Sequence, residues 1–245
     1  GGGMFAVEDD LTLGPRKKAA SPVAVQPQAS VQPSAGQVIR PERQADQSPE
    51  EVWNAYFQAL LDASEDEQLA VRASVRTTAR HLMNEEQFEE AIAMLRAALR
   101  HGFPQPWMYE GLALALQATE APLEEIERTM MSVVDFATNM DDILVVAEYM
   151  THLGLDRRAL ELFQEVAATQ PFRPEPYLRG LAAAQRMDDE HGIIWTCKGI
   201  LRQAWPIDQQ SMAEYAFRVA RATFEKMKTE GRQEQAERFE KEVAQ

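Results

Sequence analysis

The chain has 245 residues, of which 45% are hydrophobic and 26% are charged, and its 39 acidic and 25 basic residues give a net charge of −14. A surface this anionic repels a phosphate backbone, so we expect no nucleic-acid partner. The longest apolar runs, such as 143–147, are far too short to span a bilayer, so we expect no membrane insertion. The single cysteine, Cys197, excludes an internal disulfide.

The segment 1–48 differs in composition from the rest of the chain. Its acidic and basic residues are equal in number, so the whole net charge belongs to 49–245. Within 19–48, two thirds of the positions are Pro, Gln, Ala or Ser and none is aromatic, which is too little apolar surface to offset chain entropy. We therefore expect residues 1–48 to be a disordered tail or linker. Acidic residues interrupt the stretch after Met4, so we expect no signal peptide in this chain and favour a cytoplasmic location.

Helical order is expected to begin at Ser48, because serine is a good N-cap, Pro49 suits the first helical position and Glu51 completes a capping box. From there apolar residues recur at helical spacing, and no run alternates long enough to predict a strand. The sequence therefore predicts an all-α fold.

Glycines mark several predicted helix ends. Gly102, Gly154 and Gly231 each follow a stretch with Lys, Arg or His in the last turn, as is typical of a helix C-terminus. Eleven helices are predicted, at 49–63, 67–83, 86–101, 105–119, 122–138, 141–153, 156–170, 174–187, 189–203, 208–229 and 232–244.

The helical part of the chain also repeats itself. Ala91 and Ala159 lie in the middle of two predicted second helices, and their separation is twice the length of a helix–turn–helix unit of about 34 residues. A Pro-x-Pro-aromatic start recurs at Trp107 and Tyr177, at nearly the same separation. Such self-similarity predicts an array of supersecondary units rather than a closed bundle.

At 140–173 the sequence resembles a tetratricopeptide repeat (TPR), because Ala159, Phe163 and Pro171 are identical to the family pattern and apolar or small residues occupy its other positions. The resemblance implies a right-handed superhelix of stacked antiparallel helix pairs over 49–245. The approximate units are 72–105, 106–139, 140–173, 174–207 and 208–245. The repeats are degenerate: Ile126 replaces a small residue of the second helix, and 208–229 is long for a first helix.

Two strings, 153–159 and 173–177, are also similar to helical segments of large bacterial multidomain proteins. This second resemblance implies that the chain is a fragment of a longer bacterial polypeptide.

No sequence motif points to catalysis. The chain has no Gly-rich phosphate loop, nucleophile elbow, HExxH or CxxC, and its four histidines lie on separate predicted helices. Carboxylate clusters such as Glu124 and Glu125 fall in first helical turns, where the helix dipole favours them. Cys197 lies on an apolar face with Ile193 and Ile200, as a buried small hydrophobe would. We expect no enzyme, cofactor or metal site; an enzyme assembled from distant residues is the least favoured hypothesis.

In tetratricopeptide arrays the first helix of each pair lines a concave groove, so the resemblance implies a site for a protein or peptide partner. The residues that it places in the groove are Arg76, Arg80, Met108, Leu112, Leu116, Leu144, Glu148, His152, Leu178, Gln185 and Arg186. An apolar middle with arginine near both ends suits a peptide with apolar anchors and a carboxylate.

Two alternatives to this groove stay open. The leucines at 112, 144 and 178 could simply pack on adjacent helices. The whole chain could be a structural spacer in a longer polypeptide, without a ligand of its own.

Overall fold

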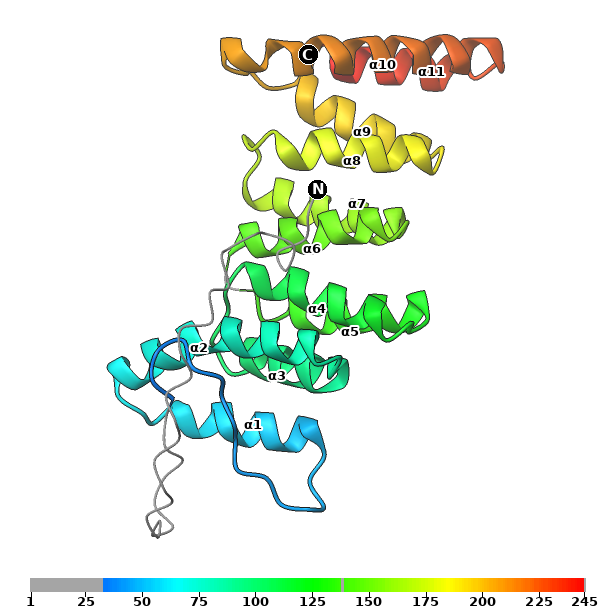
Figure 1. Cartoon of the computed structure of the whole chain (residues 1–245). Coiled ribbons are helices and arrows are strands. Elements are labelled where there is room, and N and C mark those ends of the chain that lie inside the picture. The colour runs from blue at the N-terminus through cyan, green and yellow to red at the C-terminus, as the bar shows by residue number, and fades with distance from the viewer. Residues whose placement is uncertain (1–32, 138, 245) are drawn as a thin grey trace, which may run out of the picture. The chain divides into compact units, whose positions relative to one another are not determined.

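The computed structural model describes residues 33–137 and 139–244 (Figure 1). These residues form eleven α-helices and one short 3-10 helix, and no strand occurs among them. The all-α fold class is therefore confirmed for the described chain. The chain divides after Ala137 into two compact units.

Unit 1 holds the first five helices. Its bounds are α1 (Pro49–Leu60), α2 (Glu65–Asn84), α3 (Phe88–Arg100), α4 (Trp107–Ala118) and α5 (Leu123–Val134). Helix α3 is central, because it packs against α1, α2, α4 and α5. Its buried side includes Ala91 together with Met94 and Leu95, so the small residue predicted to lie within a second helix is indeed in the core.

Unit 2 holds the remaining elements. Its bounds are α6 (Met140–His152), α7 (Asp156–Thr169), α8 (Glu175–Arg186), α9 (Glu190–Leu201), η2 (Ile207–Gln209), α10 (Gln210–Thr229) and α11 (Gln233–Val243). Each α-helix packs against the next, and α6 also contacts α8 while α9 also contacts α11. The helices of this unit are thus antiparallel pairs packed against one another. Ala159 and Phe163 are fully buried, and so is Cys197, as predicted.

All eleven predicted helices are present, and most of their ends lie close to the predicted positions. The N-cap at Ser48 is confirmed, because its hydroxyl accepts the Glu51 N–H at 3.2 Å. The largest difference is α5, which ends at Val134 instead of 138. There the chain tightens into shorter-range turns, in which Phe136 N–H donates to Val133 O and Ala137 N–H to Val134 O.

The turns of four successive helix pairs, from α2–α3 to α8–α9, repeat at a fixed interval, and the α10–α11 turn at Gly231 departs from it. Glu86, Glu120, Gly154 and Asp188 have φ between 51° and 78°. Successive members are evenly spaced along the chain, at the interval of about 34 residues that is typical of helix–turn–helix repeats. After Gly154 the N–H of Leu155 donates to the Met150 carbonyl, which closes the helix end. The interval found in the sequence is therefore also an interval of backbone conformation.

The packing of α8 on α9 depends on a glycine. A methyl group added at Gly199 would overlap the ring of Tyr177. That ring cannot easily move, because its hydroxyl donates to the Pro171 carbonyl at 2.9 Å and it stacks on Trp195 at 5.6 Å between centroids. Gly199 is thus the position at which the two helices come close enough to bury the aromatic cluster.

The prediction of a disordered tail over 1–48 extends too far towards the C-terminus, because residues 33–48 are ordered. Residues 1–32 lie outside the described residues, but 33–48 lead into α1 with a defined path along unit 1. Ile39 is only 3% exposed, and its N–H donates to Thr78 Oγ1 on α2 at 2.8 Å. Composition alone misses this order because one buried isoleucine and a few hydrogen bonds anchor an otherwise polar segment.

The recurring left-handed turn predicts opposite changes in stability when its glycine is replaced and when a glycine replaces its non-glycine residue. Gly154→Ala should lower the free energy of unfolding by about 1 kcal/mol, because an L side chain is strained at positive φ. Glu86→Gly should raise it by roughly 0.5 kcal/mol, since relief of that strain outweighs the added freedom of the unfolded chain. Urea unfolding followed by circular dichroism measures both, and equal effects of the two changes would contradict the role of the turn.

The close approach of α8 and α9 gives a second prediction. Gly199→Ala should lower the free energy of unfolding by about 1–3 kcal/mol through overpacking against Tyr177. Gly180→Ala is the matched control on α8, because its new methyl group would meet neighbours at ordinary distances of 3.5 Å or more. The control should be neutral or stabilising by roughly 0.5–1 kcal/mol. Similar losses for both variants would show that neither position is specially packed.

Candidate functional site

The predicted groove residues of unit 1 are mostly in its core. Met108 and Leu112 on α4 have no exposed surface, and Leu116 is also buried. Helix α4 packs against both α3 and α5, so these side chains fill the space between helices and offer nothing to a partner. Arg76 and Arg80 lie half-buried on α2.

The predicted groove residues of unit 2 are divided between core and surface. Leu144 is buried on α6, whereas Leu178 on α8 is 41% exposed. Glu148, which was predicted from α6, forms an ion pair with Arg179, the residue after Leu178. The structure therefore joins Glu148 of α6 to α8 through Arg179, although it buries Leu144 of the same predicted groove.

The exposed side of α8 continues towards α10. Tyr215 on α10 is 39% exposed, and its hydroxyl donates to Gln185 Oε1 on α8 at 3.2 Å. The Arg218 guanidinium lies over the Tyr215 ring, 5.8 Å from its centroid. We call this the α8 surface and define it as Glu148, Leu178, Arg179, Gln185, Arg186, Tyr215 and Arg218.

The α8 surface combines two exposed apolar groups with three arginines. Arg186 donates twice to Asp156 Oδ1, at 2.8 and 3.1 Å, and Arg179 is held by Glu148. Arg218 is exposed and forms no ion pair with any described residue. It can therefore bind a carboxylate without losing an existing ion pair.

Sequence reasoning missed Tyr215 and Arg218 because the family resemblance is weakest on α10. The signal available was the helical spacing itself: Met212, Ala216 and Ala220 form the buried stripe, and Tyr215 lies at its edge. A partly exposed tyrosine at that edge can present both its ring and its hydroxyl.

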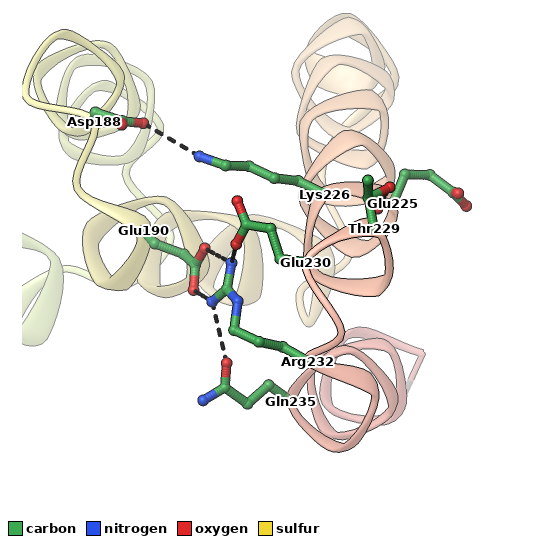
Figure 2. Close-up of polar contacts among 8 residues, drawn as sticks. All are labelled: Asp188, Glu190, Glu225, Lys226, Thr229, Glu230, Arg232 and Gln235. Carbon is green, nitrogen blue, oxygen red and sulfur yellow. Dashed lines mark hydrogen bonds and ion pairs between the residues drawn. The ribbon is translucent and has the colours of Figure 1, made fainter.

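Ion pairs join successive helix turns along unit 2. Arg157 donates to Asp189 at 2.7 Å, which links the start of α7 to the turn before α9. Figure 2 shows the next link, in which Arg232 before α11 donates to both carboxylate oxygens of Glu190 at 2.5 and 2.8 Å. This bidentate bond is the main reason that the pKa of Glu190 lies below its usual value. Lys226 lies 3.8 Å from Asp188 at the same edge.

These turn contacts are better explained as structural than as chemical. The carboxylates are paired with arginine or lysine, and each pair joins neighbouring helical hairpins. A cleft of about 440 Å³ opens beside Glu190 between α9 and α11, with Ile194, Met227 and Phe239 among its walls. Most of its charged residues already bind one another, so the cleft has no evident reactive group.

The lone cysteine and the carboxylate and histidine side chains give no sign of a reactive or metal-binding site among the described residues. Burial raises the pKa of the Cys197 thiol to about 12, so this cysteine is an unreactive core residue. Among the described residues, no cluster of His, Cys, Asp or Glu could hold a metal ion. Over the same part of the chain, no helix has both the length and the apolar composition needed to cross a bilayer.

Comparisons with protein-family models, curated proteins and solved structures found no match to this chain.

Proposed function

We propose that this protein is an interaction scaffold, that its helix pairs are degenerate tetratricopeptide-like repeats forming a superhelical array, and that it binds a peptide or partner protein through the α8 surface. The constant interval between the left-handed turns of four successive helix pairs, at Glu86, Glu120, Gly154 and Asp188, supports the repeat assignment. The observation that carries the binding role is the exposure of Leu178 on α8 and of Tyr215 on α10, the latter in contact with Arg218, which has no ion-pair partner among the described residues.

The same residues indicate the chemistry of the partner. Leu178 and the ring of Tyr215 provide apolar area that a partner side chain would bury, worth roughly 1.5–3 kcal/mol for a fully buried aliphatic anchor. Arg218 can bind a carboxylate on the same ligand. We therefore expect a segment with an apolar anchor and at least one acidic residue near it.

A structural spacer is the second candidate. It is favoured by the complete burial of Met108 and Leu112, which removes the apolar middle of the groove implied by the family resemblance. It is also favoured by the internal ion pairs of Arg179 and Arg186, because arginines that are already bound to carboxylates need no outside ligand.

A peptide-display selection on the full chain separates these candidates. We expect enriched peptides that share an apolar residue near an acidic one and that bind with a measurable Kd in fluorescence anisotropy. Leu178→Asp should weaken that Kd by roughly 10-fold to 100-fold, because it removes the apolar anchor contact. Arg218→Glu should also weaken binding of the peptides that carry the acidic residue.

Phe172→Asp is the matched control, since Phe172 is a strongly exposed apolar residue of the same unit and lies outside the α8 surface. It should leave the Kd unchanged. If no peptide is enriched, or if Phe172→Asp and Leu178→Asp weaken binding equally, the binding proposal fails and the spacer is favoured.

A further inference from the structure

Residues 34–43 lie along unit 1 in the manner of a bound peptide. The segment has no regular secondary structure, and its main chain is recognised by side chains of α2. Thr78 Oγ1 accepts the Ile39 N–H at 2.8 Å, and the Ser74 hydroxyl donates to Ser34 O at 3.1 Å. Ile39 itself is buried as the apolar anchor.

A second anchor lies further along the segment. Arg43 donates to both oxygens of Glu90 on α3, at 2.5 and 2.9 Å. Glu90 also accepts the indole N–H of Trp53 at 2.8 Å, and Trp53 is itself buried on α1. The carboxylate is thus held by unit 1 in a position that suits a guanidinium, with the bidentate geometry that favours arginine over lysine. The bond from Arg43 is the largest cause of the lowered pKa of Glu90.

The side chains of unit 1 that bind residues 34–43 would keep other hydrogen-bond partners if the segment left. The Thr78 hydroxyl already donates to the Ser74 carbonyl at 2.7 Å, within α2. A helical serine can likewise donate to a carbonyl of the preceding turn, so Ser74 keeps a partner if Ser34 leaves. Glu90 would keep its bond from Trp53. Vacating the surface therefore leaves few buried polar groups unsatisfied.

The segment itself is held mainly at its two anchors. Residues 42–46 are exposed, and a cleft of about 690 Å³ lies between 41–47 and the side of α1 that includes Val52 and Tyr56. A stretch with so few buried contacts is expected to open at low free energy.

We propose that the surface formed by α1, α2 and α3 is a recognition site for an extended peptide with an aliphatic residue and an arginine spaced as Ile39 and Arg43 are, and that residues 34–43 are its built-in occupant. A partner segment with this pattern competes with the chain's own segment for Ser74, Thr78 and Glu90. The site belongs to unit 1 and does not depend on the function proposed for the α8 surface.

The test uses full-length variants and a fluorescent synthetic peptide with the sequence of residues 33–47. In the wild-type chain the attached segment competes at a local concentration of order millimolar, so the free peptide should bind weakly. Arg43→Glu weakens only the attached segment, and the peptide should then bind at least about tenfold more tightly, as measured by anisotropy. Ile39→Asp is a second releasing variant and should act in the same way.

Two further variants control this experiment. Glu90→Arg removes the receptor carboxylate and should abolish binding of the peptide, while a peptide carrying Arg43→Glu should bind that variant. Arg40→Glu changes an exposed charge next to Ile39 that forms no ion pair with any described residue, and it should behave as the wild-type chain.

Hydrogen exchange over 34–43 reports whether the attached segment has opened. We expect the amide of residue 39, whose N–H is bonded to Thr78, to be protected in the wild-type and Arg40→Glu chains and to exchange at least about tenfold faster in the Arg43→Glu and Ile39→Asp chains. Unchanged exchange in both releasing variants would overturn the proposed anchors. Faster exchange without peptide binding would overturn the recognition site and show that the segment is only part of the fold. Equal peptide binding to the Arg43→Glu and Glu90→Arg chains would overturn the assigned specificity.

Discussion

The constraint on which this structure depends is that one pair of antiparallel helices cannot cover its own apolar side. Within each unit most helices therefore pack against the next helix, and several also pack against the one after it, as α1 does with α3 and α6 with α8. Small residues at the contacts make this possible: Ala159 is fully buried, and Gly199 leaves room for the ring of Tyr177. Burial of aromatic and aliphatic side chains between the pairs then stabilises both pairs together.

Charge is organised around this packing. The chain carries 39 acidic residues, and several of them lie at the N-terminal ends of second helices, where the helix dipole favours negative charge. In unit 2 arginines from adjacent turns bind these carboxylates, as Arg157 binds Asp189 and Arg232 binds Glu190. A surplus of negative charge thus coexists with specific contacts that join one hairpin turn to the next.

The two proposed surfaces would use different physics for recognition. In unit 1 the chain's own segment is held by hydrogen bonds to its backbone, one buried isoleucine and a bidentate bond to Glu90. These contacts define both a direction and a spacing. The α8 surface instead presents partly exposed side chains, Leu178 and Tyr215, whose burial would be completed by a partner. A partner of the unit 1 surface would have to displace residues 34–43. A partner of the α8 surface would bind without displacing any segment of the chain.

Local features of the sequence were enough to predict the helices, because helical periodicity, the cap at Ser48 and the turn at Gly154 depend on residues near one another in the chain. The same reasoning placed Cys197 in the core. It could not separate the buried Leu112 from the exposed Leu178, because both are apolar residues of first helices and only the neighbouring helices decide which is covered. It also could not find the contact of Arg43 with Glu90, since the two are distant in the sequence and packing alone brings them together.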